Sequence, residues 1–165
     1  MTVAIYAGSF DPVTSGHLDI ARRASTLFDK LYVAVYDTPV NKRPLFSTDQ
    51  RVELFRDAVQ DLKNVEVISY TGLTVDLAKR VGAQALVRGL RATSDFEAEF
   101  SMALMNKKIA PDLETVCLVT KVEHQFLSSS LVKEVVSLGG PAAGLVPPGV
   151  EQQLRDALQR RQQQA

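Results

Sequence analysis

Glycine and hydroxyl residues followed by a histidine form the segment of this chain that most favours chemistry. It reads Gly8-Ser9-Phe10-Asp11-Pro12-Val13-Thr14-Ser15-Gly16-His17 and comes directly after the apolar run 3–7. A strand that breaks at such residues, followed by a helix that starts near Gly16, directs backbone N–H groups and a positive helix end at a phosphate. The spacing Thr14-x-Gly16-His17 therefore indicates a nucleotide-binding turn, with a purely structural histidine as the alternative.

Two further segments carry cations that suit an anionic ligand. Arg88 and Arg91 flank Gly89 after the apolar run 85–87, and Lys42-Arg43 stands between two prolines. Forked guanidinium donors match phosphate oxygens, and a glycine beside them allows close backbone approach. The alternative for both segments is a set of solvated surface charges.

Three consecutive serines, Ser128-Ser129-Ser130, precede a helix-forming segment at 131–136. They supply either one helix N-cap with two spare hydroxyls or a second helix start whose N–H and O–H donors face the same polyphosphate. Asp95, Glu97 and Glu99 are expected to balance the arginines in the first turns of a helix, although Glu99 also suits hydrogen bonds from a nucleotide.

The elements that must position these residues alternate between strand and helix. We expect strands near 2–7, 31–36, 65–70, 84–88 and 114–120, and helices near 16–28, 48–62, 73–81, 94–109, 129–138 and 148–161, with a frayed end after them. Residues 47–50 read as a capping box for the second helix. The rhythm predicts a single α/β domain, 1–165, built on a doubly wound open sheet of five parallel strands with helices on both faces. Its ligands would bind beyond the carboxyl ends of the strands, in the loops 8–17, 37–46, 71–74, 88–95 and 121–130.

Composition excludes several classes of function. The 165 residues carry 19 basic and 19 acidic side chains, so no general attraction to nucleic acid or to an anionic membrane is expected. No apolar stretch approaches about 20 residues, the length of a membrane span, and the N-terminus lacks the layout of a signal peptide, which favours a cytoplasmic location. No cluster of His, Asp or Glu has the spacing of a metal cage, so no built-in metal site is predicted.

Two apolar features are interpreted as packing rather than chemistry. Cys117 is the single cysteine, and its place in the apolar run 116–119 predicts a buried, inert thiol. Phe96, Phe100, Ala103 and Leu104 form a stripe at helical spacing that is typical of core or interface packing.

The segments 8–17, 41–44, 88–91 and 127–133, taken together, closely resemble those of the bacterial phosphopantetheine adenylyltransferases. The T-x-G-H element alone would indicate only the wider nucleotidyltransferase superfamily, which has a Rossmann-like fold. The order and spacing of all four segments narrow the resemblance to this one family. It implies transfer of AMP from ATP to 4′-phosphopantetheine, giving dephospho-CoA and pyrophosphate. It also implies Mg²⁺ bound with the ATP, a homohexamer, and coenzyme A as a candidate inhibitor.

The resemblance also implies roles for individual residues. His17, Lys42 and Arg91 are expected to act in catalysis by positioning and electrostatic stabilisation, without a general base. Ser9, Lys42, Thr74 and Arg88 are expected to contact the phosphopantetheine. The residues expected to contact ATP are Ser9, Phe10, His17, Gly89, Leu90, Arg91, Glu99, His124, Gln125, Phe126, Leu127, Ser128, Ser129 and Ser130.

Three positions depart from the commonest pattern of the family. Ser9 replaces threonine and keeps the hydroxyl, His124 stands where tryptophan is frequent, and Thr74 stands at a place that is often apolar. Within enzymes, the alternative is another adenylyl- or cytidylyltransferase with a different phosphorylated acceptor. Outside enzymes, a nucleotide-binding regulatory module or a flavodoxin-like carrier would use the same architecture.

Overall fold

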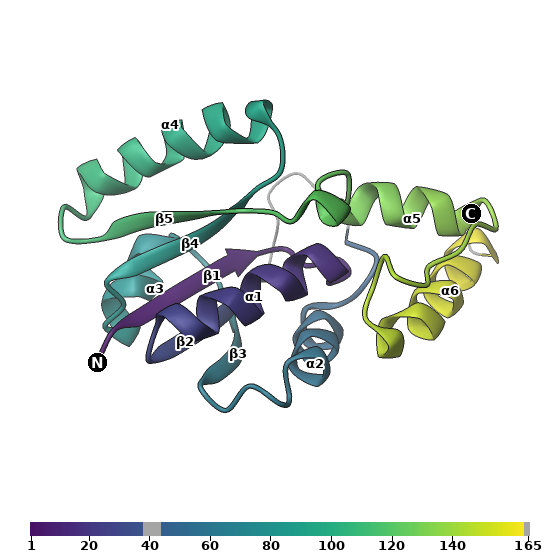
Figure 1. Ribbon diagram of the computed structural model, residues 1–165. Coiled ribbons are helices and arrows are strands. Elements are labelled where there is room, and N and C mark those ends of the chain that lie inside the picture. Colours follow the sequence, from purple (N-terminus) through teal and green to yellow (C-terminus); the bar gives the residue numbers. More distant parts are fainter. Residues whose placement is uncertain (38–43, 164–165) are drawn as a thin grey trace.

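The computed structural model describes residues 1–37 and 44–163. In this part of the chain, five parallel strands form one sheet in the order β3-β2-β1-β4-β5 (Figure 1). The strands are β1 (Val3–Gly8), β2 (Lys30–Tyr36), β3 (Val65–Tyr70), β4 (Ala85–Leu90) and β5 (Glu114–Val119). The helices are α1 (Ser15–Leu27), α2 (Thr48–Ala58), α3 (Thr74–Val81), α4 (Thr93–Ile109), α5 (Ser129–Ser137) and α6 (Pro148–Gln163). The predicted doubly wound α/β sheet is confirmed.

Each face of the sheet carries its own hydrophobic core. Because successive side chains of a strand point to opposite faces, Tyr6 and Val87 pack on one side and Ile5 and Leu86 on the other. The first core includes residues of α1, α2, α5 and α6, and the second includes residues of α3. The chain therefore winds in one direction from β1 to β3 and in the other from β4 to β5, with the reversal between β1 and β4.

The predicted ends of helix α2 and strand β4 were wrong. Helix α2 begins with the expected capping box, in which the Ser47 hydroxyl accepts the N–H of Gln50 at 3.2 Å. It stops at Ala58 rather than 62, because Val59 leaves the helical region (φ −117°, ψ 15°). Strand β4 continues past residue 88, since its pairing with β5 extends to Leu90. The two residues at 88 and 89 therefore lie inside the strand.

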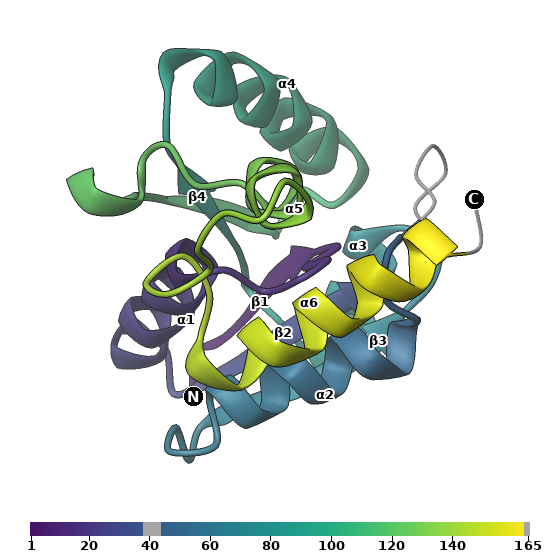
Figure 2. The same cartoon turned by 90° about the vertical axis from the view of Figure 1, so that its right-hand side faces the viewer.

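The C-terminal part of the chain packs back on the first core. Helix α6 lies beside α2 (Figure 2), and its Leu154 is fully buried. The N–H of Ser15, at the start of α1, donates to the carbonyl of Leu145 at 2.9 Å. The predicted end of the last helix at 161 was two residues short, because α6 continues to Gln163.

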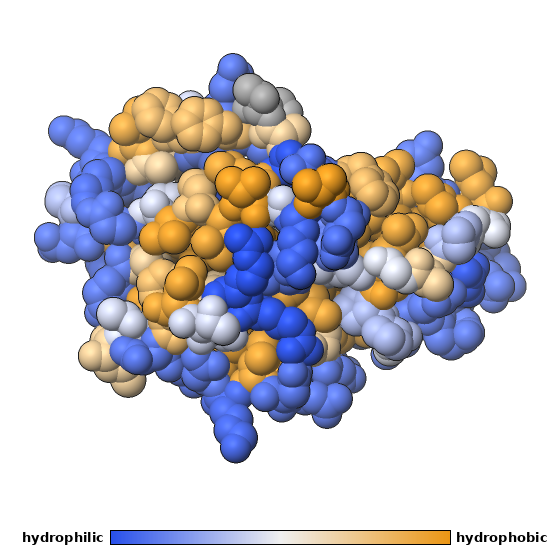
Figure 3. All heavy atoms as spheres, in the orientation of Figure 1, coloured by the Kyte–Doolittle hydropathy of each residue, from blue (hydrophilic) through white to orange (hydrophobic). Residues whose placement is uncertain are grey.

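Helix α4 has an unusually exposed apolar surface. Phe96, Phe100, Met102, Leu104 and Met105 are between 52% and 57% exposed. Figure 3 shows apolar side chains gathered over the part of the molecule where α4 lies. Packing of this stripe into the core of its own chain is therefore ruled out, whereas packing against another molecule stays a prediction.

The prediction of a buried thiol was also wrong, because Cys117 is exposed. Strand β5 is an edge strand, and Val119, two residues on and so on the same face as Cys117, is also exposed. Desolvation still raises the pKa of the Cys117 thiol. Among the described residues, no helix is both long enough and apolar enough to span a bilayer.

Candidate active site

A cleft of about 430 Å³ opens beyond the carboxyl ends of β1 and β4, where the strand order reverses. This is the place where open α/β sheets bind their ligands. The cleft is lined by residues 6–11, Thr14, Gly16, His17, Ile20, Pro44, Arg88, Gly89, Arg91, Asp95, Glu99, Thr120, His124, residues 127–130 and Lys133. Segments that are far apart in the sequence thus meet at one site, as the position of the strand ends predicts.

The turn after β1 is held in a strained conformation by its own aromatic ring. Phe10 has a φ of 47°, which a residue other than glycine keeps only where the surrounding contacts enforce it. Its ring is buried, edge-on to Tyr6, Phe55 and His17 at centroid distances of 5.2, 4.7 and 5.1 Å. Gly8 is required above it, because a Cβ there would lie 2.8 Å from the ring. The ring belongs to the core, so stacking of Phe10 on a nucleotide is ruled out in this conformation.

His17 belongs to the N-terminal cap of α1. Thr14 is the N-cap residue, and its hydroxyl accepts the N–H of His17 at 3.3 Å. The side chain of His17 in turn accepts the N–H of Thr14 at Nδ1, at 3.1 Å. A ring nitrogen that accepts from a backbone amide carries no proton, so the neutral imidazole has its proton on Nε2.

The electrostatic surroundings keep this imidazole neutral. Burial lowers the pKa of His17 to about 4, and the positive charges of Arg91 and Arg88 act in the same direction. A neutral histidine with a fixed N–H is a hydrogen-bond donor whose charge does not change near neutral pH. A bound polyphosphate would raise its pKa, because it adds negative charge to the same cleft.

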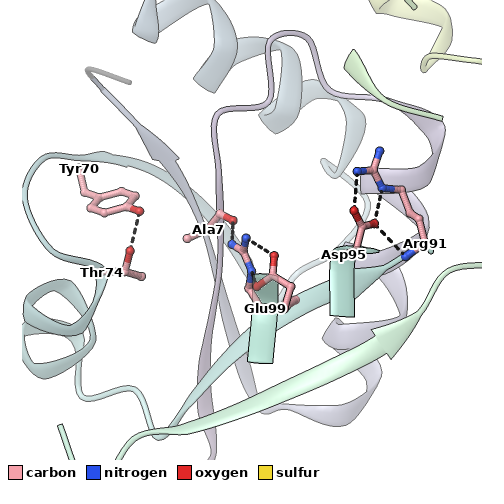
Figure 4. A network of polar contacts seen from close by, with 7 residues as sticks. Ala7, Tyr70, Thr74, Arg91, Asp95 and Glu99 are labelled. Atoms are coloured by element: carbon pink, nitrogen blue, oxygen red, sulfur yellow. Dashed lines mark hydrogen bonds and ion pairs between the residues drawn. The ribbon is translucent and has the colours of Figure 1, made fainter. Parts of the chain in front are cut away.

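The two arginines of the cleft are each paired with an acid from helix α4 (Figure 4). Arg88 makes a two-pronged ion pair with Glu99, with both N–O distances at 2.7 Å. Arg91 pairs with Asp95 at 3.0 Å and also donates to the carbonyl of Leu127 at 2.7 Å. The interpretation that acids of this helix balance the arginines is therefore confirmed for Asp95 and Glu99 but not for Glu97, which makes no ion pair with either arginine in the described part of the chain.

The three serines at 128–130 do not all make the same contacts. Ser128 caps α5, accepting the N–H of Leu131 at 3.1 Å. Ser129 donates to the carbonyl of Pro12 at 2.8 Å, which ties α5 to the turn after β1. All three serines line the cleft. The N-terminus of α5 therefore faces the same space as the N-terminus of α1, and both helix ends favour an anion there.

A second cavity, of about 310 Å³, shares part of its wall with the first. Ala7, Arg88 and Glu99 line both cavities, and Nη1 of Arg88 donates to the carbonyl of Ala7 at 2.8 Å (Figure 4). Much of the remaining lining is apolar, from Leu73, Val75, Leu86, Met102, Ala103 and Ile109. Thr74 lies here, with its hydroxyl 2.8 Å from that of Tyr70. The two cavities thus meet at a guanidinium.

Several predicted site residues lie away from the first cleft. Leu90, Gln125 and Phe126 are not among its lining residues, and Phe126 is 61% exposed. Thr74 lines the second cavity only. Lys42 lies outside the described residues. The other residues expected to contact ATP line the first cleft together.

Sequence reasoning missed a buried ion pair beside the cleft. Lys133 donates to Asp11 at 2.8 Å, and the Asp11 side chain is 9% exposed. Asp11 also accepts the backbone N–H groups of Leu45 and Phe46, at 2.9 Å each. The available signal was weak: Lys133 stands beside Glu134 between the apolar pairs 131–132 and 135–136 of a helical segment, where a charge that turns inward needs a partner.

The acids of the cleft are all engaged with cations of the same chain. Asp11, Asp95 and Glu99 pair with Lys133, Arg91 and Arg88, respectively. Within 1–37 and 44–163, no group of three or more His, Cys, Asp or Glu side chains is arranged to hold a metal.

Comparison with known proteins places the chain in a family. Residues 5–135 match the cytidylyltransferase-like family. A phosphopantetheine adenylyltransferase of Heliobacterium modesticaldum is 55% identical over 150 residues, which cover 91% of this chain and 89% of the relative. The chain belongs to the phosphopantetheine adenylyltransferase family. Family members from Carboxydothermus hydrogenoformans (51% identical, covering 97% of this chain and 98% of the relative) and Synechococcus sp. (56%, covering 93% and 96%) agree.

Solved structures extend the likeness of fold beyond the phosphopantetheine adenylyltransferases. A candidate nicotinate-nucleotide adenylyltransferase of Vibrio parahaemolyticus has a TM-score of 0.73 at 20% identity, covering 97% of this chain and 96% of its own. A lipopolysaccharide core biosynthesis protein of Thermoplasma volcanium has a TM-score of 0.56 at 21% identity, covering 73% and 98%. At such identities the likeness concerns the fold alone.

Proposed function

We propose that this protein transfers the adenylyl group of ATP to 4′-phosphopantetheine, giving dephospho-CoA and pyrophosphate. The observation that carries the proposal is the meeting of two cavities at Arg88, one lined by His17 and two helix N-termini, the other largely apolar. A triphosphate suits the first, and a phosphate on an extended arm suits the junction and the second. Relatives of this name at 51–56% identity support the same acceptor.

The reaction needs placement more than proton transfer. An oxygen of the acceptor phosphate attacks the α-phosphorus of ATP, and the bond from that phosphorus to the bridging oxygen of the β-phosphate breaks. The attacking phosphate is already anionic near neutral pH, with a second pKa of about 6, so no general base is required. The protein must hold two anions in line and stabilise the charge on the phosphoryl oxygens.

Each cation of the site has a role in this scheme. Nε2–H of His17 donates to an oxygen of the α-phosphate as negative charge develops on it. Arg91, with the N-terminus of α5 and its serines, binds the phosphates of ATP. Arg88 and Lys42 hold the acceptor phosphate, and the place of Lys42 in the scheme comes from the family resemblance. Mg²⁺ enters as part of the substrate MgATP and leaves with pyrophosphate.

The second cavity is proposed to hold the pantetheine arm. Its apolar lining suits the hydrocarbon part of the arm, whereas Tyr70, Thr74 and Asn106 supply polar groups for the amides. Desolvation raises the pKa of Tyr70, so its hydroxyl keeps its proton near neutral pH and stays available as a donor.

The direct test is to incubate the pure protein with MgATP and 4′-phosphopantetheine and to measure release of pyrophosphate and formation of dephospho-CoA. We expect both products in equal amounts. CTP in place of ATP, and other phosphorylated acceptors such as nicotinate mononucleotide in place of phosphopantetheine, test the alternatives. Faster turnover with one of these would contradict the proposed substrate. Tight ATP binding without any turnover would favour a regulatory module.

We also propose a homohexamer in the cytoplasm, with coenzyme A as a competitive inhibitor. The exposed apolar residues of α4 support an assembly, because a patch of this kind on a monomer marks an interaction site. Coenzyme A shares both the adenylate and the pantetheine arm of the product, so it would compete for the two joined cavities. Sedimentation analysis and inhibition kinetics check these two points.

A further inference from the structure

Arg51 is a fully buried cation that the scheme above does not use. It lies in the first turn of α2, and its side chain is 0% exposed. Both N–H groups of Nη1 have backbone partners, the carbonyl of Ser9 at 2.8 Å and that of Tyr36 at 2.9 Å. Nη2 donates to the carbonyl of Asp37 at 3.1 Å and to the hydroxyl of Thr48 at 2.9 Å. All four η hydrogens are therefore committed to fixed acceptors.

The bonds of Arg51 join the chain just beyond the last paired residues of β1 and β2, Gly8 and Val35. Ser9 belongs to the turn after β1, whereas Tyr36 is the last residue of β2 and Asp37 follows it. A guanidinium suits this task because its planar fork reaches several carbonyls in one geometry, which the single point charge of an ammonium does not. Among the described residues, no carboxylate lies within ion-pair distance of Arg51, so its hydrogen bonds go to three carbonyl oxygens and one hydroxyl, while the charges of Asp11 and Asp37 act on it from farther away.

The carbonyl of Ser9 precedes the strained residue of the site. Phe10 keeps its φ of 47° only because contacts on both sides enforce it. One of these contacts is the packing of its buried ring against Phe55. The other is the hydrogen bond from Arg51 to the carbonyl of Ser9, which fixes the peptide group between Ser9 and Phe10. If that peptide turned over, the N–H of Phe10 and the hydroxyl of Ser9 would face differently at the cleft.

We propose that Arg51 is a positioning residue for the adenylyl transfer: its buried guanidinium clamps the turn at Ser9–Phe10 to the end of β2 and so fixes the groups that this turn presents to the substrates. The inference rests on the proposed function. It predicts an effect on turnover that exceeds any effect on nucleotide affinity, because in-line attack tolerates misplacement less than binding does, with about 100-fold lost for about 1 Å.

The test compares Arg51→Lys with Arg56→Met, a change at an exposed arginine of the same helix whose side chain reaches only the carbonyl of Val67. Pyrophosphate release gives kcat and both KM values, calorimetry gives the Kd of ATP, and thermal melts give the folded fraction. We expect Arg51→Lys to lower kcat about tenfold or more, with the ATP Kd changed less than about threefold and a folded fraction near one. Arg56→Met should match the wild type.

A second readout is independent of activity. Amide hydrogen exchange at Phe10 and Asp11 should be faster in Arg51→Lys than in the wild type and unchanged in Arg56→Met. If the wild type made no dephospho-CoA, the proposed function would fail, while this exchange would still decide whether Arg51 holds the turn.

If Arg51→Lys does not fold, Thr48→Val replaces it in the test. This substitution removes one acceptor of the Arg51 guanidinium and keeps the positive charge of Arg51. It should lower kcat more than ATP affinity, by a smaller factor than Arg51→Lys. A folded Arg51→Lys protein with wild-type kcat and wild-type exchange would overturn the proposal. So would a loss of activity that only follows the folded fraction, or a Thr48→Val protein without any effect on kcat or exchange.

Discussion

The backbone N–H of Thr14 and Nδ1 of His17 lie 3.1 Å apart, so the cap of α1 and the tautomer of the imidazole are one structural feature. The hydroxyl of Thr14 lies at the same distance, 3.1 Å, from Nδ1. The histidine reaches the cleft with its protonated nitrogen free for a ligand, and the same bond that orients it also satisfies an amide at the helix end.

The first prediction concerns the charge of His17. Because burial and two arginines lower its pKa to about 4, the ring should stay neutral from pH 8 down to about 5. The unfolded chain, with a histidine pKa of about 6.5, binds the proton first, so His17 should lower the stability of the fold as pH falls from about 6.5 to about 4. Nitrogen-15 NMR titration checks this, and MgATP should raise the midpoint. A midpoint near 6.5 in the free protein would contradict it.

The second prediction concerns the role of the same side chain in turnover. His17→Ala should lower kcat about 100-fold or more, the usual effect of removing a donor to developing negative charge, while the ATP Kd changes far less. Stability should fall by about 1 kcal/mol, because half of the capping box is lost. His124→Ala, at the other histidine of the cleft, is the control and should lose much less turnover. Equal losses in kcat and in ATP affinity would contradict this prediction and show that His17 acts only in binding ATP.

The third prediction separates the two arginines. Arg88 lines both cavities, whereas Arg91 lines only the first. Arg88→Met should therefore raise the KM of phosphopantetheine about tenfold or more and affect ATP binding less, since a charge-assisted hydrogen bond is worth about 1.5–3 kcal/mol. Arg91→Met should show the opposite pattern. Steady-state kinetics with each substrate varied would reveal it, and identical profiles for the two variants would argue against separate subsites.

The fourth prediction concerns the buried pair of Asp11 and Lys133. Lys133→Met leaves a nearly buried carboxylate without its cation, but Asp11 keeps the N–H groups of Leu45 and Phe46. We expect a loss of about 1–3 kcal/mol in the free energy of unfolding. Lys30→Met, which breaks a pair with the half-exposed Glu66, should cost less than about 1 kcal/mol. Urea unfolding measures both, and similar losses would show that burial of the pair does not matter.

The fifth prediction tests the apolar surface of α4. Phe100 is 53% exposed and stacks on Phe96 with ring centroids 5.8 Å apart. Phe100→Asp should dissociate the assembly, because a charge at the centre of an apolar contact must lose its water. Leu138→Asp is the control, at an 82% exposed residue that caps the C-terminal end of α5, and Figure 1 shows α5 and α4 on opposite sides of the view. Sedimentation velocity reports the result. An unchanged assembly in Phe100→Asp would place the interface elsewhere.

The fold was predictable because local patterns and topology agree. The alternation of strands with helical patterns fixed five strands and their direction, and the reversal beside β1 located the cleft. Most misses were at the ends of elements, where tertiary contacts decide. Strand β4 extends to Leu90 because it pairs with β5 up to that residue, and no residue type near position 88 predicts this extension. Exposure of Cys117 depends on how little of the chain covers its face of β5, which an apolar run alone does not reveal.

The candidate site was predictable in its cations and serines but not in its supports. His17, Arg88 and Arg91 stand at strand ends or helix starts, where sequence position implies a place in space. Arg51 and Lys133 act from within helices, and their partners Ser9 and Asp11 lie 42 and 122 residues away. Only packing shows that these side chains turn inward, since an arginine or lysine in a helix is usually on the surface.

The pairing of β1 with β4 has a consequence for how the two substrates are brought together. Tyr6 stands opposite Val87 as the last pair of the ladder, so Ala7 and Arg88, which line both cavities, directly follow this pair, one on each strand, and are joined by a hydrogen bond. The spacing between donor and acceptor is thereby set when the chain folds. The register of these two strands therefore sets the distance between the substrates. A slip of one residue between them would turn Arg88 to the opposite face, and the two cavities would no longer meet at its guanidinium.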